Sequence, residues 1–141
     1  MDGIILLFVI WKFLLGECRA MVKIELIEKS DAILRYKYYP EGDTTKMAGI
    51  IFVDRKLETI ETEVPAEGDF MAYASVSELN KMRNAINQMR KMDGRELLTE
   101  EELPTATEDS EWLYYADHAI RRIIEEYNNG IIQEKDTVAW C

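Results

Sequence analysis

The chain has 141 residues, of which 48% are hydrophobic and 31% are charged, and it carries a formal net charge of −10. This length suits a single domain, and the composition is that of a globular protein rather than a disordered or membrane-embedded one. The negative charge argues against general nucleic-acid binding, because neutralising phosphates requires clustered Lys and Arg. The two cysteines, Cys18 and Cys141, lack the spacing of a disulfide framework or a zinc site, which favours a reducing, cytoplasmic location.

Residues 4–15 (IILLFVIWKFLL) form the most apolar run of the sequence, and three interpretations of residues 1–20 stay open. We favour a start assigned too early, with translation beginning at Met21, because Gly16-Glu17 can be encoded as a purine-rich ribosome-binding site. The second interpretation is a signal or membrane-associating segment, which would make the protein exported or membrane-associated. Against it, Asp2 has the wrong sign for a signal peptide, and a spanning helix needs about 20 apolar residues. The third is a structural helix.

From Met21 onward the sequence alternates between apolar and polar residues, the period of a half-buried strand. The alternation and the turn residues between its segments predict strands over residues 21–29, 33–39, 47–53, 57–64 and, near the end of the chain, 137–140. Four consecutive strands with short connections predict an antiparallel meander.

A first helix is predicted by the capping box Ser75-Val76-Ser77-Glu78, and Asp93-Gly94 ends it. Its apolar residues recur at intervals of three and four and form a narrow stripe: Leu79, Met82, Ile86 and Met89. Residues 96–111 contain seven acidic residues and no basic one, which predicts a mobile linker. A second helix is expected from about Asp109 to Asn128. Its predicted buried face comprises Trp112, Leu113, Ala116, Ile120, Ile123, Ile124 and Tyr127.

These elements predict an α+β fold, a mainly antiparallel four- to five-stranded sheet with the C-terminal helix packed on one face. Residues 21–141 would form one domain, in which residues 71–108 are an inserted, peripheral helical arm with an acidic linker.

The sequence offers no grouping of residues that predicts a catalytic, cofactor or metal site. His118 is the only histidine, and its place on the polar side of the second helix predicts an exposed residue rather than an acid–base group. The acidic triplet at residues 100–102 lacks the ligand spacing of a calcium loop. There is no Gly-rich phosphate loop and no pair of cysteines separated by two residues.

Charge is unevenly distributed around the first helix. Residues 79–95 contain five basic residues and one acidic residue, a net charge of +4, whereas residues 96–111 have a charge of −7. Either the acidic segment folds back on the helix, or the helix docks on another molecule through its Met-rich stripe. The candidate interaction surface consists of Lys81, Met82, Arg83, Met89 and Arg90 on the helix, with Tyr39, Tyr114 and Tyr115, which fall off the apolar faces of their elements.

Three segments resemble small acidic proteins of low-GC Gram-positive bacteria and their phages: YKYYPEG at 36–42, WLYYADHAIRRIIEEY at 112–127 and VAW at 138–140. The resemblance implies a short β-meander leading into one aromatic-rich helix and an aromatic C-terminus. That group has no assigned activity, so the resemblance implies no functional residues. Relative to it, residues 71–108 look like an insertion.

Two hypotheses for function follow from the sequence. The first is a non-enzymatic protein–protein interaction or accessory module, of phage or mobile-element origin, that binds an unidentified protein or a second copy of itself through the helix at 75–92. The alternative is a small-molecule binder or enzyme with a pocket between the sheet and the second helix.

Overall fold

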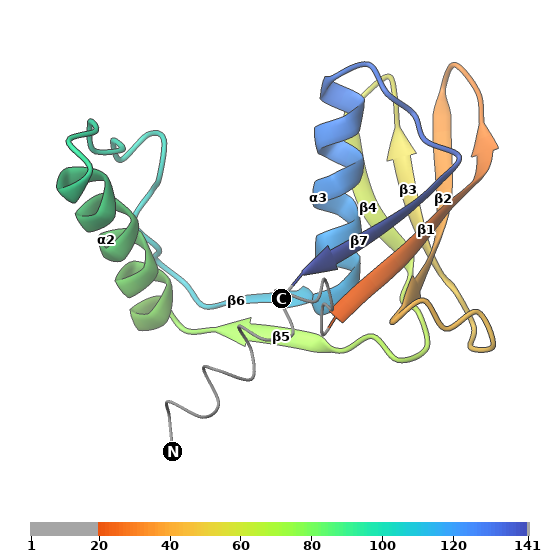
Figure 1. The fold of residues 1–141 in the computed structure, drawn as a ribbon, viewed down its shortest axis with the longest axis horizontal. Helices are drawn as coiled ribbons and strands as arrows, with labels where there is room; N and C mark the ends of the chain where they lie inside the picture. Colours follow the sequence, from red (N-terminus) through yellow and green to blue (C-terminus); the bar gives the residue numbers. More distant parts are fainter. Residues whose placement is uncertain (1–19, 141) are drawn as a thin grey trace. The chain divides into compact units, whose positions relative to one another are not determined.

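The computed structural model describes residues 20–140, so residues 1–19, on which the interpretations of residues 1–20 depend, and the thiol of Cys141 lie outside the described residues. The chain divides into two compact units (Figure 1). The described part of the first unit, which we call the core unit, comprises residues 20–70 and 113–140. The second, the insertion unit, comprises residues 71–112. Within residues 20–140, no helix combines the length and apolar character needed to cross a membrane.

The core unit is built on one five-stranded antiparallel sheet, so the predicted meander is confirmed. The strands lie in the order β4-β3-β2-β1-β7, and the last strand of the chain therefore pairs with the first (Figure 1). Their bounds are β1 (Ala20–Lys29), β2 (Ile33–Pro40), β3 (Gly49–Asp54), β4 (Thr59–Val64) and β7 (Lys135–Trp140). They agree with the predicted strands to within two residues at each end, because the alternation of apolar residues extends to the turns.

One helix, α3 (Tyr114–Asn128), covers one face of this sheet and completes the hydrophobic core. Side chains alternate along each strand, and those on the helix-facing side are buried: Val22, Ile24, Leu34, Tyr36, Tyr38, Ile51, Val53 and Val138. The helix contributes Tyr115, Ala116, Ala119 and Ile123 to the same core. Alanine at two of these positions brings the helix backbone close to the sheet.

The prediction for α3 was wrong about the residue at which the helix begins and about some of the residues on its buried face. The helix begins at Tyr114 rather than near Asp109, because residues 110–113 are extended and pair in a second sheet. Ile124, expected in the core, is 41% exposed, while Tyr115 is buried. Ile120 and Tyr127 are partly buried and pack against the core, as expected.

The N-terminus of α3 is capped by a side chain from a distant part of the chain. Leu113 occupies the capping position and offers no side-chain acceptor. Instead Asp69 accepts hydrogen bonds from the backbone N–H groups of Tyr115 (Oδ1, 2.8 Å) and Ala116 (Oδ2, 3.1 Å), and the carbonyl of Phe70 accepts one from Tyr114 N–H (2.9 Å). The 69–70 segment therefore satisfies three of the four N–H groups that a helix start leaves without an internal partner.

The same carboxylate anchors the centre of the sheet through a tyrosine. Tyr38 is fully buried; its hydroxyl donates to Asp69 Oδ2 (2.8 Å) and accepts from the Ala66 N–H (2.9 Å). Burial raises the pKa of this hydroxyl, so it stays protonated and able to donate. The ring lies over Gly49, where an added Cβ would clash with it, so β3 needs glycine at its start.

The insertion unit has a short two-stranded sheet and one helix. The strands are β5 (Met71–Ala74) and β6 (Ser110–Leu113), the latter ending at the boundary with the core unit, and the helix is α2 (Val76–Met92). The α2 prediction is confirmed, including the capping box: Ser75 Oγ accepts from Glu78 N–H, and Glu78 accepts from Ser75 N–H, both at 3.2 Å. The two strands were not predicted, because four residues are too few to show a period.

Replacing Asp69 by Ala should lower the free energy of unfolding by about 2–4 kcal/mol, because two helix N–H groups and the Tyr38 hydroxyl lose their acceptor together. Urea denaturation followed by circular dichroism measures it. Asp31→Ala, at an exposed turn position, is the control and should change stability by less than about 0.5 kcal/mol. Equal stability of the two variants would show that the Asp69 cap does not hold the helix.

Candidate functional site

The helix α2 presents two different faces, one polar and one apolar. Asn80, Arg83, Asn87 and Arg90 recur at intervals of three, four and three residues and therefore share one face. This face binds residues 96–106, a segment without regular structure that returns along the helix and that we call the strap.

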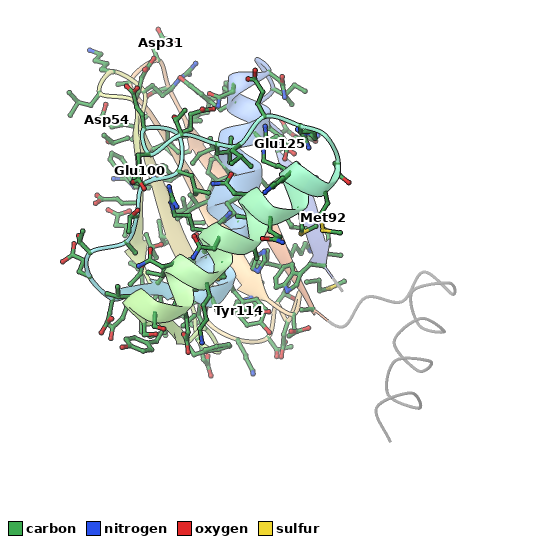
Figure 2. The ribbon with its side chains drawn as sticks, turned by 90° about the vertical axis from the view of Figure 1, so that its left-hand side faces the viewer. Asp31, Asp54, Met92, Glu100, Tyr114 and Glu125 are labelled. Atoms are coloured by element: carbon green, nitrogen blue, oxygen red, sulfur yellow. The ribbon has the colours of Figure 1, made fainter. Side chains whose placement is uncertain are left out.

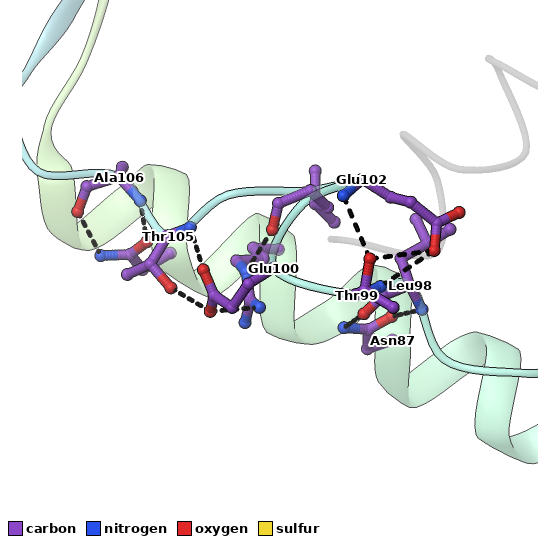
Figure 3. A network of polar contacts seen from close by, with 10 residues as sticks. Asn87, Leu98, Thr99, Glu100, Glu102, Thr105 and Ala106 are labelled. Carbon is purple, nitrogen blue, oxygen red and sulfur yellow. Dashed lines mark hydrogen bonds and ion pairs between the residues drawn. The ribbon is translucent and has the colours of Figure 1, made fainter.

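Two asparagines hold the strap by its backbone (Figure 3). The Asn80 side chain accepts from Ala106 N–H (2.8 Å) and donates to the Ala106 carbonyl (3.2 Å). In the same way Asn87 accepts from Leu98 N–H (2.8 Å) and donates to the Leu98 carbonyl (3.3 Å). Each side-chain amide thus bonds both the N–H and the carbonyl of one strap residue, as a neighbouring β-strand would. These two contacts fix the strap at two points along the helix.

Two arginines bind the strap between and beside these points. Arg83 Nε donates to the Leu103 carbonyl (2.8 Å), and its Nη2 pairs with Glu100 Oε1 at 2.6 Å. Arg90 Nε donates to the Glu96 carbonyl (2.7 Å). Arg83 and Arg90, predicted as residues that contact a partner, are therefore occupied within the chain.

Glu100 organises the middle of the strap. Besides Arg83, it accepts hydrogen bonds from the hydroxyl (2.5 Å) and the N–H (2.9 Å) of Thr105. The bonds from Thr105, together with the charge of Arg83, lower the pKa of this carboxyl. Glu100 lies within a turn at Thr99–Leu103, in which Thr99 and Glu102 cap each other as in a helix start.

The segment expected to be a mobile linker is thus bound along the helix, and the fold-back interpretation is confirmed. Charge contributes less than the sequence suggested. Within residues 20–140, Arg83–Glu100 is the only ion pair between α2 and the strap, and backbone carbonyls receive the other arginine contacts.

The apolar face of α2 is not covered within the described residues. Met82 is 60% exposed, Ile86 41%, Met89 65% and Met92 78%, and none of the residues of α2 is buried. Lys81, beside this face, is also exposed. Figure 2 labels Met92 near the C-terminal end of α2 and Glu100 in the strap. We call Met82, Ile86, Met89 and Met92 the methionine stripe.

The three tyrosines predicted for the surface are placed differently. Tyr115 is buried, its hydroxyl donates to Glu41, and burial raises its pKa. Tyr114 packs on the core: its ring stacks on Phe70 (4.9 Å between centroids), and its hydroxyl accepts from Trp140 Nε1 (2.9 Å). Tyr39 is half-buried on the sheet face away from α3. The expectation failed for Tyr114 and Tyr115 because the helix is rotated relative to its predicted face.

His118 is not the exposed residue that the sequence predicted. Its ring stacks on Trp140 with 3.7 Å between centroids and 10° between planes, and burial lowers its pKa. The contact joins α3 to β7. No nucleophile hydrogen-bonded to His118 occurs within residues 20–140, so its observed role is packing.

A pair of carboxyl groups near the C-terminal end of α3 was missed by the sequence. Glu126 and Asp136 both lie beside Arg122, whose Nη1 is 3.3 Å from Asp136 Oδ2 and 3.9 Å from Glu126 Oε1. Burial, followed by the hydrogen bond and charge of Asp136, raises the pKa of Glu126 to about 7. The two residues belong to different elements, so no spacing in the sequence could have paired them.

Among residues 20–140, no group of three or more His, Cys, Asp or Glu side chains is placed to hold a metal ion. Comparison with known proteins adds no assignment: no family model, curated protein or solved structure matches the chain.

The Glu126 pair predicts a pH-dependent stability. Because the folded pKa exceeds the unfolded value, Glu126 holds its proton in the folded state between about pH 4.5 and 7, so stability falls as pH rises through that window. Glu126→Gln keeps a donor toward Asp136 and should raise the free energy of unfolding on the order of 2 kcal/mol at pH 8, with little gain at pH 4. Urea titrations at both pH values measure it; an equal gain at both would disprove the assignment.

Asn87→Ala should release the strap without unfolding α2, because its two bonds to Leu98 are lost while the capping box remains. Digestion by a Glu-specific protease should cut after Glu96 or Glu100 to Glu102 about tenfold faster. The matched control is Asn84→Ala, an exposed position on the same helix. If Asn87→Ala were cleaved at the rate of Asn84→Ala, the two hydrogen bonds between Asn87 and Leu98 would not hold the strap.

Proposed function

We propose that the protein is a non-enzymatic interaction module that binds another protein through the methionine stripe of α2. The observation that carries this proposal is the exposure of four large apolar side chains on a helix whose opposite face is already bound by the strap. The strap covers the polar face of α2, and within residues 20–140 nothing covers the stripe.

The chemistry of the stripe suits recognition. Methionine is unbranched and polarizable, so a surface built from it adapts to partners of different shape. Apolar residues at intervals of three and four residues are also how helices enter the grooves of partner proteins or pair with other helices. The flanking Lys81 favours a partner groove with an acidic rim.

An enzymatic function is supported less well. The sole histidine is stacked on a tryptophan, and the carboxyl pair at Glu126 has Arg122 as its neighbour but no nucleophile among its described contacts. A cytoplasmic location and a phage or mobile-element origin remain part of the proposal, supported by cysteine usage and by the resemblance noted above.

The stripe is tested by the double variant Met82→Asp/Met89→Asp. Because both side chains are more than half exposed, the variant should keep the wild-type unfolding free energy to within about 0.5 kcal/mol. Binding to the partner should fall by at least about a hundredfold, since central apolar contacts dominate such interfaces. The partner is first identified by cross-linking and mass spectrometry, and its affinity is then measured with purified proteins.

Ser77→Asp/Asn84→Asp is the matched control, because it adds the same charge to exposed positions of the same helix away from the stripe. This variant should bind as the wild type does. Sedimentation of the chain alone distinguishes self-association, in which case the stripe variant should dissociate the oligomer. A partner that both double variants bind equally well would contradict the proposal.

A further inference from the structure

A pocket of about 250 Å³ lies in the core unit, between the second half of α3 and the hairpin formed by β3 and β4. Its walls are mainly apolar: Val53 and Ile60 from the sheet, Ile123 and Ile124 from the helix. Val53 and Ile123 belong to the buried core, whereas Ile124 is 41% exposed. The helix therefore lines the pocket with one buried and one exposed isoleucine.

Two carboxylates line this pocket, and no Lys or Arg does. They are Asp54, at the end of β3, and Glu58, in the turn that leads to β4. Neither forms an ion pair with another residue of the 20–140 range. Arg55 belongs to the same turn, but its Nη1 donates to the Ser30 carbonyl (2.7 Å) and its guanidinium lies 5.9 Å from the Tyr127 ring.

The position of Asp54 is fixed by the turn. Its Oδ1 accepts from the N–H groups of Lys56 and Leu57, each at 3.0 Å. Within the described part of the chain, no donor reaches its second oxygen, Oδ2. The carboxylate is therefore held in place with one oxygen available to a ligand.

These features define the ligand. A volume of 250 Å³ lies below the roughly 300–1,000 Å³ of pockets for drug-sized molecules, so the apolar body is one ring or a short alkyl chain. Carboxylates without basic partners favour a cation and repel an anion. The Tyr127 ring, which also lines the pocket, adds aromatic surface for the apolar body.

We infer that this pocket binds a small organic cation, a primary ammonium group on a compact apolar body. The ammonium group pairs with Asp54 and Glu58 at the mouth, and the apolar body contacts Val53, Ile60 and Ile123. This site belongs to the core unit and is independent of the methionine stripe, so either proposal can fail without the other.

Phenethylamine is the probe, with 2-phenylethanol and 3-phenylpropionate as neutral and anionic analogues of similar size. Each is titrated into the ¹⁵N-labelled full chain, and amide chemical shifts are followed. Phenethylamine should give saturable shifts confined to the amides of residues 53–60 and 123–128. The alcohol should bind about tenfold more weakly, and the acid should give no saturable shift.

Two variants locate the site. Ile124→Trp fills the pocket from an exposed position and should abolish the shifts. Glu58→Gln should weaken phenethylamine binding about threefold without affecting the alcohol, whereas Glu125→Gln, at an exposed position of α3 outside the pocket, should change neither.

Absence of a saturable shift with phenethylamine, or equal binding of the acid and the amine, would overturn the inference. Should Ile124→Trp fail to fold, the comparison of Glu58→Gln with Glu125→Gln decides it: equal affinity of these two variants for the amine also overturns the site.

Discussion

The structure depends on one carboxylate, that of Asp69. It accepts hydrogen bonds from the N–H groups of Tyr115 and Ala116 at the start of α3 and from the hydroxyl of Tyr38 at the centre of the sheet. The same contact closes the point at which the insertion unit leaves and rejoins the core unit, since the Phe70 carbonyl bonds Tyr114 N–H. The two ends of the core unit that flank residues 71–112 are thus held together within the core unit itself.

The two units of the chain are stabilised by different kinds of interaction. The core unit is stabilised by burial, with apolar residues of four strands and α3 facing each other. The insertion unit has no such core, and Ala74 is its only described buried residue. Its order depends on directional contacts, namely the capping box, two asparagine–backbone pairs and the arginine contacts to the strap. Such contacts are worth about 1 kcal/mol each, so a single substitution among them is enough to loosen the strap.

The sequence predicted the features whose cause is local and failed where the cause is distant. Strand alternation and the capping box at Ser75 and Glu78 act within a few residues, so the meander and α2 were found. The cap of α3 comes from Asp69, which in the sequence is one more residue of a turn. Trp112 was assigned to the helix because its spacing to Ala116 is helical, although pairing with β5 keeps residues 110–113 extended. For the strap a signal did exist: Asn80, Arg83, Asn87 and Arg90 form a polar stripe at helical spacing, which a solvated face does not require.

The polar stripe also helps to explain the methionine stripe on the other face of α2. A helix that had only to hold a returning segment could do so more simply with its apolar residues, because burying each methionine would contribute about 2 kcal/mol. Here the chain binds the strap with amides and guanidinium groups and leaves Met82, Ile86, Met89 and Met92 in contact with solvent. Exposed side chains of this kind gain nothing for folding, and they carry the hazard of aggregation. One helix is therefore divided into a polar face that orders the insertion unit and an exposed apolar face, and this division is the basis for the proposed binding of another protein.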